Sequence, residues 1–186
     1  MTTIPENHPL RQLFQKLVGQ IFAGPLGLRD ARLLRYVANL LTDFAHIDHI
    51  YRLRNMRGKR LEEVAEMLME GSILLNATSF QREREVHKHI GDFTLFWTGV
   101  YPEALRFFRA PTRKDHLIDY VQQGKKSYYV ASTFQSPAYR DEWPVLRQLS
   151  EEFEVCSFGL GLVRQEWEKL GDPAVRLIME AFGETF

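Results

Sequence analysis

Apolar side chains recur every three or four residues along most of the chain. This spacing places them on one face of an α-helix, whereas a half-buried strand would show alternating polar and apolar residues. The run SYYVASTF, residues 127–134, is rich in strand-favouring residues, but its flanks suit a helix about equally well. The pattern predicts helices at residues 9–23, 30–47, 61–71, 79–99, 102–108, 112–133, 143–171 and 172–182.

Local signals mark the ends of several of these helices. Gly24, followed by proline, ends the first helix, Asp30 is a preferred N-cap for the second, and Gly71 ends the third. A length of 186 residues is typical of one domain. We therefore expect an all-α, single-domain bundle of about seven or eight helices over residues 1–186, with one long central helix and with residues 1–8 disordered.

The segment at residues 112–133 contains two features that affect its limits. Thr112 and Asp115 have the spacing of a capping pair, which predicts that a helix begins there and buries Leu117. Gly124 lowers helix stability by about 1 kcal/mol relative to alanine, so a break is expected near this residue.

The central stretch, Ser79–Glu103, contains the side chains best suited to chemistry. Steps of three and four place seven side chains on one side of the helix, namely Phe80, Glu83, His87, Ile90, Thr94, Trp97 and Tyr101. A lone carboxylate in an apolar interior is costly unless it is paired or protonated, so Glu83 needs a partner such as His87, an arginine, a tyrosine hydroxyl or a metal ion. We predict a ligand-binding surface formed by Phe80, Glu83, His87, Thr94, Trp97 and Tyr101.

A second polar group lies on the opposite side of the same helix. It consists of Glu85, Lys88, His89 and Asp92, which are joined by steps of three and four residues. We expect these side chains to form an interacting network in water, without a functional role.

Composition excludes several classes of protein. Lys plus Arg equals Asp plus Glu at 24 each, so no net charge attracts nucleic acid or an anionic membrane. Cys156 is the only cysteine, which excludes an internal disulfide and a cysteine-based zinc site, and it is expected to be a small buried residue. The N-terminal sequence does not resemble a signal peptide, and no apolar run is long enough to span a membrane. These observations predict a cytoplasmic protein.

A metal-dependent enzyme is the alternative hypothesis. Its site would combine acids and histidines from several helices, namely Glu83, His87, Asp43, His46 and His116. Helical carboxylate-bridged metal proteins use repeated Glu-x-x-His pairs, whereas this chain has Glu83-x-x-x-His87 and Asp43-x-x-His46. Haem ligation by His87 is a further option. No cofactor is predicted, and neither a transition metal nor haem is required by the sequence.

A basic tract gives a third and weaker hypothesis. Its five cations are Arg52, Arg54, Arg57, Lys59 and Arg60. Such a tract can bind phosphate or a nucleic-acid backbone, but no nucleic-acid-binding motif accompanies it. Glu62, Glu63 and Glu66 follow closely and offer ion-pair partners, so a solvated face is favoured over nucleic-acid binding.

Common catalytic motifs are absent from the sequence. It has no glycine-rich phosphate loop, no G-x-S-x-G turn and no H-E-x-x-H motif. Whether the protein is an enzyme is therefore left open. The leading hypothesis is a non-enzymatic protein that binds a small ligand or a protein partner through the Glu83–Tyr101 helix and self-associates through an aromatic or glycine-bearing face.

Overall fold

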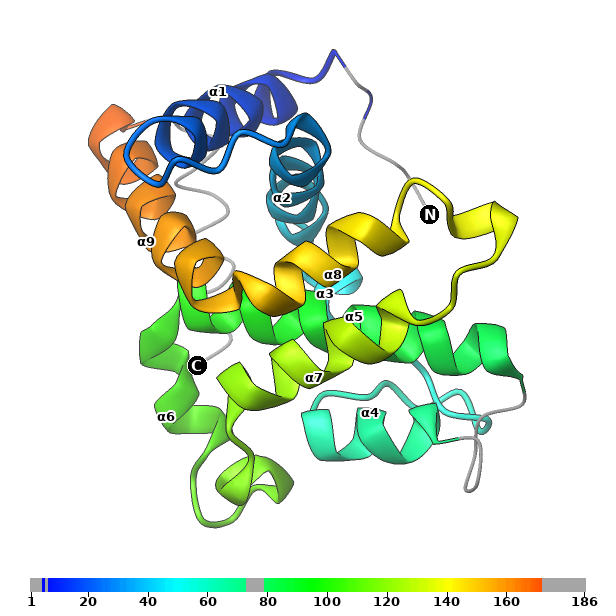
Figure 1. Cartoon of the computed structure of the whole chain (residues 1–186). Coiled ribbons are helices and arrows are strands. Elements are labelled where there is room, and N and C mark those ends of the chain that lie inside the picture. Colours follow the sequence, from blue (N-terminus) through cyan, green and yellow to red (C-terminus); the bar gives the residue numbers. More distant parts are fainter. Residues whose placement is uncertain (1–4, 6, 73–78, 172–186) are drawn as a thin grey trace.

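The computed structural model describes residue 5, residues 7–72 and residues 79–171 (Figure 1). Within this part the fold is all-α without a β-strand, which confirms the predicted fold class. The α-helices are α1 (Pro9–Ala23), α2 (Ala31–Phe44), α3 (Ile47–Ile50), α4 (Val64–Gly71), α5 (Phe80–Gly99), α6 (Leu105–Phe108), α7 (Tyr120–Ser132), α8 (Trp143–Glu151) and α9 (Phe153–Leu170). Three 3₁₀ segments, at Pro102–Ala104, Lys114–Leu117 and Pro137–Tyr139, complete the described secondary structure. No helix in the described part is both long and apolar enough to cross a bilayer.

Side chains and glycines set the helix ends as the local signals predict. The carboxylate of Asp30 accepts a hydrogen bond from the backbone amide of Arg32 at 2.8 Å, and Ser79 Oγ accepts one from the amide of Arg82 at 3.1 Å. These bonds satisfy amides that have no partner inside their helices. Gly171 has a φ of +61°, the left-handed conformation that ends a helix and favours glycine.

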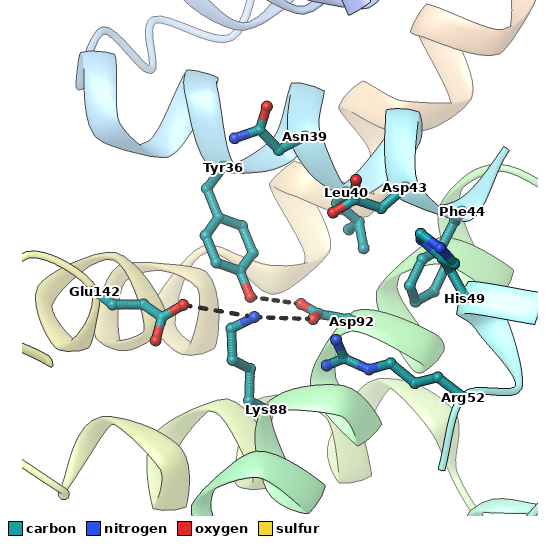
Figure 2. Close-up of a pocket in the computed structure, with 10 residues that line it drawn as sticks. All are labelled: Tyr36, Asn39, Leu40, Asp43, Phe44, His49, Arg52, Lys88, Asp92 and Glu142. Atoms are coloured by element: carbon teal, nitrogen blue, oxygen red, sulfur yellow. Dashed lines mark hydrogen bonds and ion pairs between the residues drawn. The ribbon is translucent and has the colours of Figure 1, made fainter. Parts of the chain in front are cut away.

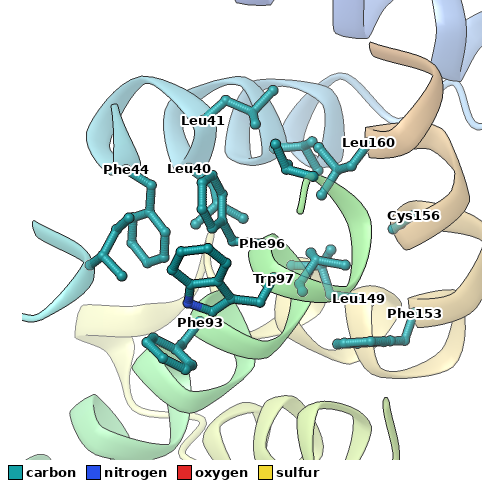
Figure 3. Close-up of a cluster of buried hydrophobic side chains, with 14 of the residues drawn as sticks. Leu40, Leu41, Phe44, Phe93, Phe96, Trp97, Leu149, Phe153, Cys156 and Leu160 are labelled. Carbon is teal, nitrogen blue, oxygen red and sulfur yellow. The ribbon is translucent and has the colours of Figure 1, made fainter. Parts of the chain in front are cut away.

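Helix α5 is the centre of the fold. In Figure 1 it crosses the middle of the molecule, with α2 and α8 on one side and α4 and α7 on the other. Every residue from His89 to Trp97 is buried, so this half of the helix has no solvent face. Its aromatic rings lie in the core cluster of Figure 3, together with side chains from α2, α8 and α9. Cys156 belongs to this cluster, and burial, with a smaller effect of Glu152, raises the pKa of its thiol to about 12.

Glycines allow two close helix contacts. A Cβ atom at Gly91 in α5 would lie 2.5 Å from the ring of Tyr128 in α7, and one at Gly159 in α9 would lie 2.8 Å from the ring of Phe22 in α1. Alanine at either position would overlap the facing aromatic ring. The missing side chain of Gly159 therefore lets α1 approach α9 closely.

The structure corrects the expected limits of the helix at residues 112–133. Thr112 and Asp115 do not cap it, because α7 begins only at Tyr120 and its N-cap is Asp119. Leu117 is 82% exposed rather than buried. No break occurs at Gly124, whose missing side chain makes room for the ring of Phe153 and the hydroxyl of Thr94.

Asp115 caps a different helix. Its two carboxylate oxygens accept hydrogen bonds from the amides of Val64 and Ala65, at 2.8 Å each, and one of them also accepts a bond from the hydroxyl of Tyr120 at 2.6 Å. Asp115 therefore joins the start of α4 to the start of α7. The predicted helix at residues 172–182, the connection at 73–78 and most of the predicted disordered segment at 1–8 lie outside the described residues, although His8 is described and caps α1.

Candidate functional site

The six residues of the predicted ligand-binding surface do not share one environment. Phe80 is 68% exposed in the first turn of α5, and Glu83 is half-buried, so the argument that a buried Glu83 needs a partner does not apply. Thr94 and Trp97 are completely buried, and Tyr101 is nearly so. The hydroxyl of Thr94 donates to the carbonyl of Ile90 at 2.7 Å. None of the six lines either polar cavity described below.

His87 faces α7 rather than Glu83. Its Nδ1 atom lies 3.3 Å from Oγ of Ser127, and no hydrogen bond or ion pair joins it to Glu83 in the described part of the chain. Burial, reinforced by the charge of Lys126, lowers the pKa of His87 to about 4. The imidazole is therefore neutral near pH 7 and packs between the two helices.

The proposed metal ligands are not brought together. Asp43 lies in α2, 4.0 Å from a guanidinium nitrogen of Arg11, while His116 lies in a 3₁₀ segment, with Nδ1 3.0 Å from the carbonyl oxygen of Arg113. The ring of His46 lies 5.7 Å from that of His49. Among the residues that the structure describes, no three His, Cys, Asp or Glu side chains are grouped closely enough to hold a metal ion.

The basic tract forms a short hairpin-like loop with several internal and neighbouring contacts. Arg60 pairs with Asp48 at 2.9 Å, and Lys59 pairs with Glu66 at 3.3 Å. A side-chain nitrogen of Arg54 donates to the carbonyl of Gly58 at 3.2 Å. Part of the tract's charge is therefore already compensated by nearby acids.

The polar group on the opposite side of α5 is the more buried one, contrary to expectation. His89 is completely buried and Asp92 is 4% exposed. The carboxylate of Asp92 accepts hydrogen bonds from the hydroxyls of Tyr36 in α2, at 2.6 Å, and Tyr128 in α7, at 2.9 Å. Its other oxygen lies 3.6 Å from Nζ of Lys88. A buried carboxylate thus joins three helices and has the partners that its charge requires.

The two tyrosines act as neutral donors to Asp92. Burial is the largest cause of a pKa well above the ordinary value for both Tyr36 and Tyr128, and the negative charge of Asp92 raises it further. A phenol with a raised pKa keeps its proton near pH 7 and can continue to donate it to the carboxylate. The arrangement therefore fixes the orientation of both hydroxyl groups.

The contacts of His89 define its tautomer. Arginine can only donate hydrogen bonds, so the 3.1 Å contact from Nε of Arg52 requires an unprotonated Nδ1 on His89. The proton is then on Nε2, which donates to the carbonyl of Ile50 at 2.9 Å. Burial, followed by the charge of Arg52, holds the pKa of His89 well below its usual value. A neutral imidazole therefore links the core of α5 to the start of the basic tract.

A cavity of about 210 Å³ lies against Asp92 (Figure 2). Its walls come from α2, α3, α5, the N-cap of α8 and the start of the basic tract. The lining residues are Tyr36, Asn39, Leu40, Asp43, Phe44, His49, Arg52, Lys88, Asp92 and Glu142. In Figure 2 the heads of Arg52, Lys88 and Tyr36 converge on the carboxylate of Asp92, while Asp43 and Asn39 project from the α2 wall. Groups of both charges therefore face one small space.

A second cleft, of about 380 Å³, lies beside this cavity and shares three of its lining residues, Arg52, Lys88 and Glu142. Glu142 pairs with Arg84 and lies 3.5 Å from Lys88, which ties the start of α8 to α5. The guanidinium of Arg84 also lies 3.5 Å from the ring centre of Tyr139. Lys88 thus lines both the cavity and the cleft, and its two carboxylate partners are Asp92 and Glu142.

One sequence signal for this site was available. The residues around Asp92 read HIGDFTLFW, in which apolar or small residues occupy all sides of a helix instead of one stripe. A helix that is apolar all round is buried all round, so a carboxylate within it must also be buried. No signal in the sequence identifies Tyr36 or Tyr128 as its partners.

Comparison with known proteins adds no functional information. No protein-family model matches the chain, and no similar protein was found among either curated proteins or solved structures. The contacts and charges around Asp92 are therefore the basis for a functional proposal.

Proposed function

We propose that this protein binds a small polar molecule in the cavity beside Asp92. The observation that carries the proposal is the convergence of Arg52, Lys88, Asp43 and Glu142 on one cavity against a buried carboxylate. Acidic and basic groups held around a partly enclosed space can replace the hydration of a polar ligand and fix its orientation.

The volume limits the size of the ligand. About 210 Å³ corresponds to roughly seven water molecules at about 30 Å³ each. Drug-sized molecules occupy pockets of about 300–1,000 Å³, so the expected ligand is smaller. Leu40 and Phe44 supply an apolar part of the wall, which suits a molecule with a short carbon skeleton between its polar groups.

Hydrogen bonds hold the part of the site that contacts the core. Tyr36 in α2 and Tyr128 in α7 both donate to one oxygen of Asp92, so two helices hold this carboxylate. Side chains that are ordered before binding lose little conformational entropy when a ligand arrives. This preorganisation supports ligand binding over a flexible solvated surface. The proposed site lies on the side of α5 opposite to the surface predicted from the sequence.

A ligand screen with a blocked variant tests the proposal. His49 is half-buried and lines the cavity, so tryptophan at this position adds volume to the wall, whereas exposed His46 lies three residues earlier and outside the lining. We expect small polar metabolites to raise the melting temperature of the wild type and of His46→Trp, but not of His49→Trp. A ligand at 100 times its Kd adds about 2.7 kcal/mol to the free energy of unfolding.

Two outcomes would contradict the proposal. One is a screen in which no small polar molecule stabilises the wild type. The other is a ligand whose effect is the same in His49→Trp, provided that circular dichroism shows both variants to be folded. The cytoplasmic location and the self-association expected from the sequence stay predictions, and size-exclusion chromatography with light scattering tests the second.

A further inference from the structure

We infer that the ligand of the cavity is an amino acid in the broad sense, a small zwitterion whose carboxylate binds Arg52 and whose ammonium group faces Asp43. This inference rests on the proposed function, because it names the class of molecule that the same cavity takes. Three observations carry it, namely the available donors of Arg52, the way in which Arg52 is held, and the balance of charge around the cavity.

The terminal guanidinium nitrogens of Arg52 carry N–H groups that can donate hydrogen bonds to a ligand. No acidic side chain in the described part of the chain lies within 4.0 Å of its guanidinium nitrogens, in contrast to Arg60, Arg82 and Arg84, which have carboxylate partners. Its Nε donates to His89, and the two terminal nitrogens make no hydrogen bond within the described residues. Arg52 lines both the cavity and the neighbouring cleft, and its head points toward the cavity in Figure 2.

His89 controls how Arg52 presents these donors. Its imidazole is completely buried and is fixed by the bond from Nε2 to the carbonyl of Ile50. Because Nδ1 of this ring binds Nε of Arg52, the edge of the guanidinium that carries Nε is occupied. The two terminal nitrogens form the fork that is left, and such a fork matches the two oxygens of a carboxylate.

The charges around the cavity favour a zwitterion over a simple anion. Two cations, Arg52 and Lys88, face three carboxylates, Asp43, Asp92 and Glu142. Arg84 pairs with Glu142 from outside the lining, so the formal charges around the cavity balance, and a dianion such as phosphate would upset this balance. A molecule that brings its own positive group removes this conflict.

Asp43 is the carboxylate best placed to receive that positive group. One oxygen of Asp92 binds two tyrosine hydroxyls and the other faces Lys88, while Glu142 is shared by Arg84 and Lys88. Asp43 lies 4.0 Å from Arg11, at the limit of an ion pair, and 44% of its side chain is exposed. Its oxygens can therefore accept hydrogen bonds from an ammonium group without displacing a short contact.

A series of small probes tests the class of ligand. Glycine, β-alanine and 4-aminobutanoate separate the two charges by different lengths, while propionate and ethylamine carry one charge each. Binding is followed by nitrogen–proton NMR spectra, including the Nε–H signal of Arg52. We expect at least one amino acid of the series to bind about tenfold more tightly than both single-charge probes, since it makes two charge-assisted contacts instead of one.

Variants assign the two ends of the ligand. Arg52→Gln is expected to abolish the response to the amino acid, and Arg52→Lys is expected to weaken it about tenfold, because a lysine keeps the charge without the fork. Asp43→Asn is expected to reduce amino-acid binding to the level of propionate. Arg57→Gln is the matched control, because Arg57 lies in the same loop, is exposed and lines neither cavity.

The outcomes separate this inference from the proposed function. If other polar molecules bind in the cavity and are blocked by His49→Trp, while no amino acid binds, the inference is wrong and the proposed function stands. Binding of an amino acid that is unchanged in Arg52→Gln would also overturn the inference. Binding of an amino acid that is lost in Arg52→Gln and kept in Arg57→Gln would support both.

Discussion

Replacement of Gly91 by alanine gives the sharpest test of the packing around Asp92. A Cβ at this position would lie 2.5, 2.6 and 2.8 Å from three ring atoms of Tyr128, distances that require the ring to move. Tyr128 is completely buried, so it has no open space to enter. Its movement would also disturb the 2.9 Å hydrogen bond that its hydroxyl donates to Asp92.

The expected magnitude follows from three opposing effects. Overpacking of a core costs about 1–3 kcal/mol, and loss of a hydrogen bond to a charged group costs about 1.5–3 kcal/mol. Alanine is a better helix former than glycine by about 1 kcal/mol, which opposes these losses. We therefore expect Gly91→Ala to lower the free energy of unfolding by about 1.5–5 kcal/mol, the steric effect being larger than the gain in helix propensity.

Gly19 provides the matched control for this substitution. It also lies inside a helix, α1, but a Cβ there would meet no atom within 4 Å. Gly19→Ala should raise the free energy of unfolding by about 0.5–1 kcal/mol. Urea unfolding followed by the helical circular dichroism signal measures both changes. The reasoning is refuted if Gly91→Ala is as stable as the wild type or as Gly19→Ala.

Two further predictions concern Asp115 and the buried histidines. Asp115→Ala leaves two backbone amides of α4 and the hydroxyl of Tyr120 without their acceptor, so it should lower the free energy of unfolding by about 3 kcal/mol or more. The control Asp119→Ala removes an exposed cap and should lower it by about 1 kcal/mol. Equal losses of stability in urea unfolding would contradict this prediction. The pKa values of His87 and His89 are lowered in the folded protein, to about 4 for His87, so the unfolded chain takes up protons first as the pH falls below about 6.5. The stability that these neutral histidines contribute is complete above about pH 6.5. As the pH falls toward the folded-state pKa, this stability is lost at up to about 1.4 kcal/mol per pH unit for each histidine. Urea unfolding near pH 7 and pH 5 measures this loss of stability, and His87→Gln should reduce it. If the loss between the two pH values is the same in His87→Gln as in the wild type, His87 is not one of its causes.

Local information in the sequence was sufficient for four of the helices, α1, α2, α4 and α5. The spacing of apolar residues places α1, α2, α4 and α5 close to their observed limits, because side chains three and four positions apart lie on the same side of a helix. Asp30 and Ser79 cap their helices through amides two and three residues away. Such contacts are encoded within a few residues and can be recognised without knowledge of the fold.

The candidate site depends on contacts that local patterns do not contain. The hydroxyls that bind Asp92 come from residues 56 and 36 positions away in the chain. Asp115 has the spacing of a local cap but binds amides 51 and 50 positions away. A helical wheel also assumes one buried face, so it assigned Asp92 and His89 to water, although other helices cover that side of α5.

The complete enclosure of the second half of α5 has a consequence for how the protein opens. From Ile90 to Trp97 every residue is buried, and the neighbouring helices come from both ends of the chain. The amide protons of this segment therefore cannot be released by fraying of a single neighbour. Their exchange with deuterium requires the whole bundle to come apart, so the slowest-exchanging amides should report its global unfolding rate or equilibrium.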